Sequence, residues 1–127
     1  MKTRSTVALS MIAGAALGAT AIHGIHAQGK PPAYYVAEIE VSNDDVYMKE
    51  WSPKVAETIK AAGGTYMARG TSIQGFEGTP PKRAVITKFD NMDKIKTWRD
   101  SAAYKSAMPI RDKAVKSVRA YAIEGVN

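Results

Sequence analysis

The chain has no cysteine, and its only two histidines, His23 and His26, lie near the amino terminus. Zinc and copper sites are built mainly from imidazole and thiolate ligands, and Ser-His-Asp or Cys-His catalysis needs an imidazole base. Residues 28–127 contain neither residue type. We therefore predict no such metal site, no histidine-based catalysis and no disulfide, so the fold must depend on core burial, within one chain or across a dimer.

Clusters of one charge sign are also absent. Lysine and arginine number 18 against 12 acidic residues, but the two signs are interleaved, as in "KFDNMDKIKTWRD" at residues 88–100. Nucleic-acid binding would call for basic residues gathered on one face with aromatic residues among them. No acidic loop with calcium-binding spacing is visible either. The sequence thus predicts no nucleic-acid partner, no metal and no cofactor.

The first 27 residues have the organisation of a secretory signal peptide. Lys2 and Arg4 give a basic start, residues 6–25 are uncharged and apolar, and Ala27 ends an "IHA" sequence suited to cleavage. The alternative is an uncleaved membrane anchor, because the apolar run approaches the roughly 20 residues that span a bilayer. Its glycine, threonine and histidine content makes it a poor permanent span. We expect cleavage, no stable membrane insertion afterwards, and a periplasmic or secreted protein.

Cleavage would leave one domain, predicted at residues 33–127, after a polar leader at residues 28–32 ("QGKPP") that we expect to be disordered. Side chains of residues 33–41 alternate between two faces with period two, which predicts a strand. Asn43 then caps an amphipathic helix that ends at a pair of glycines. Pro53 is expected to bend this helix, or to lie close to its true start.

A glycine-rich stretch, "GGTYMARGTSIQGFEG" at residues 63–78, holds five of the chain's ten glycines. A phosphate-binding loop would need Gly-Lys-Ser/Thr before a helix, or GxGxxG between a strand and a helix, and neither occurs. We interpret these glycines as the end of a helix and as bends and turns between strands, with Gly75 bending a strand. The strands themselves are predicted at residues 65–69 and 82–89.

The rest of the chain repeats the pattern of helix followed by strand. Asn91 is a predicted helix cap, a break is expected near Ser101, and Pro109 is expected to kink the second helical piece. Residues 118–126 alternate as a closing strand. The element order βαββαβ predicts an α+β, ferredoxin-like domain, in which a four-stranded antiparallel sheet carries two helices on one face.

Several motifs in order resemble the family called domain of unknown function 1330: "YYVAEIEV", "AAGGTYMARG", "PPKRAVITKFDNMDKIKTWRDSAAYKSAMPIRDKA" and a late "EG". The resemblance covers about residues 34–125. Lys88 stands where the family often has Glu, and Thr71 replaces a frequent glycine. The resemblance implies a ferredoxin-like subunit of a dimeric α/β barrel, hence a homodimer, with a small-molecule cleft between sheet and helices. The family has no settled activity.

Four residues are candidates for binding a ligand in that cleft: Arg69, Trp98, Tyr104 and Arg111. Arginine can hold a carboxylate with its planar fork, and aromatic rings can wall a pocket. Each also has a structural interpretation, namely ion pairs of Arg69 with Glu77 or Asp100 and of Arg111 with Glu124, and core packing of the two aromatic residues. Tyr47 and Trp51 are predicted to be core.

The sequence leaves two functions open, and it nominates no nucleophile and no tuned base. One is the binding of a small anionic or aromatic molecule by an exported dimeric α/β-barrel protein, with enzymatic activity undecided. The alternative is a non-catalytic dimeric scaffold or interaction module, in which the same residues are purely structural.

Overall fold

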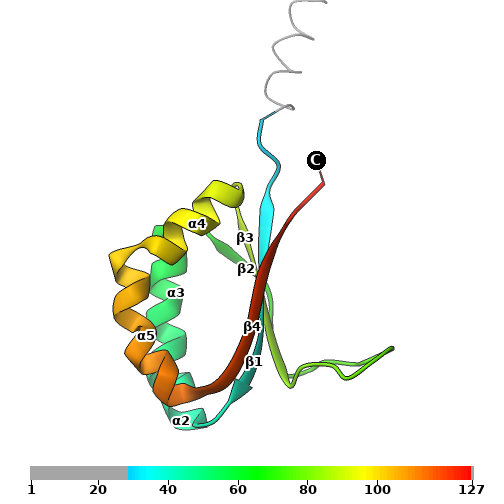
Figure 1. The fold of residues 1–127 in the computed structure, drawn as a ribbon, viewed down its shortest axis with the longest axis vertical. Helices are drawn as coiled ribbons and strands as arrows, with labels where there is room; N and C mark the ends of the chain where they lie inside the picture. Colours follow the sequence, from blue (N-terminus) through cyan, green and yellow to red (C-terminus); the bar gives the residue numbers. More distant parts are fainter. Residues whose placement is uncertain (1–28, 127) are drawn as a thin grey trace, which may run out of the picture. The chain divides into compact units, whose positions relative to one another are not determined.

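A four-stranded antiparallel sheet forms one layer of the computed structural model, which describes residues 29–126. The strands follow the order β2-β3-β1-β4 across the sheet, and helices cover one face of it (Figure 1). This confirms the predicted α+β, ferredoxin-like fold. The predicted signal peptide lies outside the described residues. The strands are β1 (Ala33–Val41), β2 (Thr65–Gly70), β3 (Arg83–Phe89) and β4 (Val115–Glu124).

The helical layer has two parts, both begun by polar caps. The first part runs without interruption through α2 (Asp44–Val46), the π-helical turn η1 (Tyr47–Trp51) and α3 (Ser52–Ala61). The second consists of α4 (Met92–Asp100) and α5 (Ala102–Ala114). The side chains of Asn43, Asn91 and Ser101 accept hydrogen bonds from backbone N–H groups of the helices that follow them, so the predicted caps and the break at Ser101 are confirmed.

Pro53 has a local consequence for the first helical part. It is the second residue of α3 but lies inside the continuous helical segment, so its missing N–H removes an intrahelical hydrogen bond, and a π-helical turn directly precedes it. In that turn the N–H of Ser52 donates to the carbonyl of Tyr47, five residues earlier. Tyr47 and Trp51, the first and last residues of this turn, are both buried.

The register of the sheet decides which side chains meet the helices. Tyr35, Ala37 and Ile39 of β1 face the helical layer and are buried, which confirms the predicted alternation. Tyr35 lies opposite Thr87 on β3 and Ala122 on β4. Side chains of the other parity form a sheet face without a helix; among its members are Tyr34, Val36, Ile86, Tyr121 and Ile123.

The connection between β2 and β3, residues 71–82, contains no strand, so the prediction that Gly75 bends a strand is wrong. Pro80 and Pro81 cannot donate the backbone hydrogen bonds of a ladder, which limits pairing there. The loop projects on the side of the sheet away from the helices (Figure 1). Phe76 in this loop is 87% exposed.

Among residues 29–126, no helix combines the length and apolar character needed to cross a membrane.

Candidate functional site

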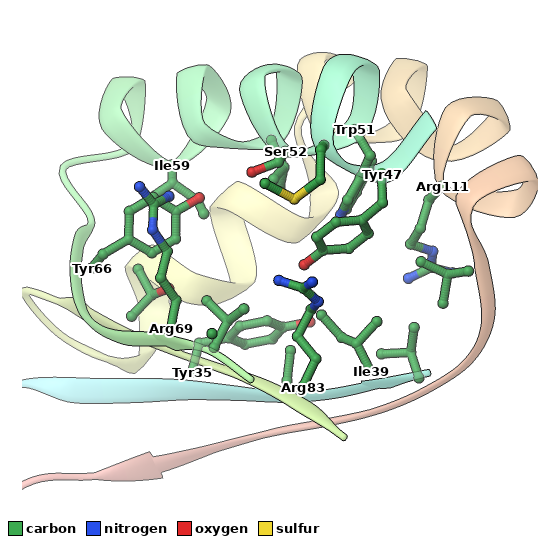
Figure 2. A pocket seen from close by; sticks show the side chains of 18 of the residues that line it. Tyr35, Ile39, Tyr47, Trp51, Ser52, Ile59, Tyr66, Arg69, Arg83 and Arg111 are labelled. Atoms are coloured by element: carbon green, nitrogen blue, oxygen red, sulfur yellow. The ribbon is translucent and has the colours of Figure 1, made fainter. Parts of the chain in front are cut away.

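A cavity of about 280 Å³ lies between the sheet and the helices (Figure 2). Its floor is made by Tyr35, Ala37 and Ile39 of β1, and its roof includes Trp51 of η1 and Val55 of α3. The lining is largely apolar, with a few polar groups between apolar side chains. This composition is typical of small-molecule sites, although the volume is at the small end of their range.

All four residues predicted from the sequence line this cavity: Arg69, Trp98, Tyr104 and Arg111. The fold therefore brings together side chains from β2, α4 and α5 that were predicted from the sequence. Whether they bind a ligand stays a prediction. Trp98 and Tyr104 are only 3% and 4% exposed, so they also belong to the core.

The aromatic end of the cavity is a packed cluster. Trp98 makes edge-on contacts with Tyr35 and Tyr104, with ring centroids 4.9 Å and 4.7 Å apart. Arg99 donates hydrogen bonds to the hydroxyls of Tyr35 and Tyr104, which holds both phenols in place. The indole N–H of Trp98 donates to Thr58 Oγ1 at 3.0 Å. This end is therefore rigid, and its polar groups are largely satisfied within the protein.

Three arginines line the cavity: Arg69, Arg83 and Arg111. None of them forms an ion pair with a carboxylate within residues 29–126, so the alternative pairings of Arg69 with Glu77 or Asp100, and of Arg111 with Glu124, do not form. Arg83 was not predicted as a site residue. Arg83, Thr87 and Phe89 are spaced by even numbers of residues on the predicted strand, so their side chains point to the same face. This spacing was the signal in the sequence that could have identified Arg83.

Two of these cations stack on tyrosine rings. The guanidinium of Arg69 lies 4.2 Å from the ring centroid of Tyr66, and that of Arg83 lies 4.7 Å from the ring centroid of Tyr47. Arg69 is opposite Val85, two residues from Arg83, so both arginines leave the sheet on the same face as near neighbours. Figure 2 shows Tyr47 and Arg83 pointing toward each other across the cavity. Tyr47, predicted as core only, is thus also a cavity residue.

Three tyrosines of the cavity, Tyr35, Tyr47 and Tyr66, are neutral hydrogen-bonding groups. Burial raises the pKa of Tyr35 to about 12, and the nearby Tyr104 adds to the increase. Burial also raises the pKa of Tyr47 and of Tyr66, against a smaller opposing effect of the neighbouring arginines. In the described part of the chain, no Asp, Glu or His lines the cavity. The site therefore offers donors and cations, and no general base for neutral pH.

Thr87 is the second feature that the sequence did not reveal. It lines the cavity on β3 and is completely buried. Its Oγ1 is the one buried side-chain oxygen or nitrogen within residues 29–126 that has no hydrogen-bond partner. Such a group costs free energy in a folded protein and calls for an explanation.

The fold and the cavity define a class: a ferredoxin-like α+β protein with an arginine-lined pocket between its sheet and its helices. The chain belongs to the family described as Domain of unknown function (DUF1330), whose model matches residues 32–126. This confirms the family resemblance seen in the sequence. No curated protein matches the chain.

Solved structures show the same fold at low identity. A protein of unknown function from Rhodopseudomonas palustris is similar with a TM-score of 0.63 and 12% identity, over 85% of this chain and 93% of that one. SnoaB, a cofactor-independent oxygenase from Streptomyces nogalater, is similar with a TM-score of 0.56 and 6% identity, over 76% and 95%. A NIPSNAP family protein of unknown function from Agrobacterium tumefaciens has a TM-score of 0.53 and 14% identity, over 77% and 91%.

Proposed function

We propose that this protein binds a small anionic aromatic molecule in the cavity. The observation that carries the proposal is the set of three arginines that line an apolar pocket without a carboxylate partner in residues 29–126. Cations placed together without counter-charges repel one another, and more strongly at a partly buried site than in water. A bound anion removes that cost, and arginine suits carboxylates because its fork can donate two parallel hydrogen bonds.

The apolar part of the cavity favours an aromatic body for this ligand. A cavity of about 150 Å³ accepts a benzene molecule, so about 280 Å³ has room for a substituted ring. Tyr47 adds a donor, because its hydroxyl has no hydrogen-bond partner in the described chain and remains protonated at neutral pH. We propose binding and no reaction, since the lining residues include no base of suitable pKa.

A scaffold function without a ligand is the competing proposal, and one pair of variants separates the two. Arg83→Met removes a cation inside the cavity, whereas Lys88→Met removes one from the same strand on the face without helices. Thermal-shift titration with benzoate should stabilise the native protein and Lys88→Met alike, and should stabilise Arg83→Met much less, because stabilisation grows with occupancy. If neither benzoate nor another aromatic carboxylate stabilises the native protein, the binding proposal is wrong.

We also propose that the protein is a homodimer that covers the sheet face without helices. Tyr121 and Ile123 on that face are 49% and 60% exposed, and large exposed apolar patches usually mark interaction surfaces. The loop of residues 71–82 projects on the same side and presents Phe76. A second copy of the chain would cover this face, because in a dimer with twofold symmetry the same surface of both subunits is in contact. Light scattering should give the mass of two chains, and Val36→Arg should give that of one; a native monomer at micromolar concentration would contradict this proposal.

Export rests on the sequence alone. We propose cleavage near Gln28, because a basic start, an apolar run and a small residue precede that position. Amino-terminal sequencing of the protein from fractionated cells should give a start at Gln28. Recovery of an intact Met1 from the membrane fraction would support the anchor instead.

A further inference from the structure

The three arginines approach the cavity from two sides. Arg69 and Arg83 belong to β2 and β3, whereas Arg111 belongs to α5, four residues before β4 begins at Val115. In the sheet, β4 is the edge strand farthest from β2, and β1 lies between β3 and β4. Figure 2 shows Arg111 on the opposite side of the cavity from Arg69, with Arg83 between them.

The sheet register gives the width of the floor between these two sides. Arg83 lies opposite Ile39 on β1, and Ile39 lies opposite Val118 on β4. Two strand spacings therefore separate Arg83 from Val118, a distance of roughly 10 Å. Between the two sides the floor is Ala37 and Ile39, which offer no polar group. The cavity thus has two cationic ends joined by an apolar floor.

Charge compensation requires more than one anionic group. The lining includes three guanidiniums, no carboxylate within the described chain, and three phenols that are neutral at neutral pH, those of Tyr35, Tyr47 and Tyr66. Arg83 and Arg111 are both half-buried, so solvent screens them less than it screens the exposed Arg69. A single carboxylate against Arg83 leaves Arg111 without a counter-charge on the other side.

We infer, on the basis of the binding function proposed above, that the ligands of this cavity are rigid aromatic diacids with acid groups at opposite ends of the ring. One carboxylate lies against Arg83, where the Tyr47 hydroxyl adds a donor. The other lies against Arg111. The ring occupies the apolar floor between them. A rigid body suits this role because it loses little conformational freedom on binding.

Calorimetric titration with three probes tests the inference: terephthalate, with carboxylates at opposite ends of the ring; phthalate, with the same charge on adjacent positions; and benzoate, with one carboxylate. We expect terephthalate to bind the native protein at least tenfold more tightly than benzoate, because a hydrogen bond between charged groups supplies a gain of that order. Phthalate should bind more weakly than terephthalate, because it cannot reach both ends.

Two variants of α5 provide the matched comparison. Arg111→Gln should remove the preference for terephthalate over benzoate, so it should weaken terephthalate binding more than it weakens benzoate binding. Lys113→Gln removes an exposed charge from the same helical turn outside the cavity, and should change neither. Equal binding of terephthalate and benzoate, phthalate binding as tight as terephthalate, or an equal effect of Arg111→Gln on both probes would overturn the diacid inference while leaving carboxylate binding intact. Failure of all three probes to bind would overturn the binding function itself.

Discussion

Two threonines that are buried within residues 29–126, Thr58 and Thr87, should respond oppositely to the same substitution. Thr58 and Thr87 are 6% and 0% exposed. We consider the change of each to valine, because the valine side chain has nearly the same shape as that of threonine. Thr58 Oγ1 accepts a hydrogen bond from Trp98 Nε1 at 3.0 Å and donates one to the carbonyl of Val55 at 2.7 Å. Thr87 Oγ1 has no hydrogen-bond partner within residues 29–126. The substitution therefore removes satisfied hydrogen bonds in one case and an unsatisfied hydroxyl in the other.

The magnitudes follow from the cost of an unpaired polar group. Thr87→Val replaces a buried, unpaired hydroxyl by a methyl group, which should raise the free energy of unfolding by about 1–3 kcal/mol. Thr58→Val leaves the buried N–H of Trp98 unpaired and should lower it by a similar amount. Helix propensity adds little to this loss, because threonine and valine are both β-branched and similar in propensity.

Urea denaturation monitored by tryptophan fluorescence, together with calorimetric melting, measures both changes. For a domain of this size each 1 kcal/mol corresponds to roughly 4–8 °C in Tm. Thr65→Val, on an exposed position of β2, is the control and should stay within about 0.5 kcal/mol of the native protein. The assignment of an unpaired hydroxyl to Thr87 would be refuted if Thr87→Val destabilised the protein, or if Thr58→Val and Thr87→Val shifted its stability in the same direction.

Two further predictions concern pH and packing. The pKa of Tyr35 is raised to about 12 from an ordinary value of 10, so the protein binds this proton more tightly when folded; the resulting stability, about 2–3 kcal/mol, is fully present below pH 10 and is lost as pH rises toward 12. Denaturation series between pH 9 and pH 12 should show this loss for the native protein and a smaller one for Tyr35→Phe; equal slopes would refute the assignment. Gly64→Ala would place a Cβ 2.7 Å from Ile59 and 2.9 Å from the ring of Phe89. We expect denaturant titration to show a free energy of unfolding lower by about 1–3 kcal/mol. An unchanged denaturation midpoint would contradict this prediction, because it would mean that Ile59 and Phe89 move aside without cost.

Local sequence alone determined most of the element boundaries. Asn43, Asn91 and Ser101 cap helices through hydrogen bonds that span only three residues, so their effect is visible in the sequence. The alternation of β1 likewise predicted that Tyr35 and Val36 face opposite sides. It left open which side the helices cover, and the structure places Tyr35 beneath them.

The composition of the cavity was decided by the tertiary structure. Arg69, Trp98, Tyr104 and Arg111 could be named from the sequence because arginines and aromatics suit ligand binding. That the two arginines form no ion pair with a carboxylate of residues 29–126 depends on how distant segments pack. Arg83 and Thr87 became cavity residues only through the pairing of β3 with β1 and β2. The alternation of side chains along a strand does not reveal which of the two faces is buried until helices cover one of them. Whether a hydroxyl is unpaired likewise depends on which neighbours from elsewhere in the chain surround it. For this reason the sequence indicated the fold and part of the site, while its charge balance and unsatisfied groups emerged only from the packed structure.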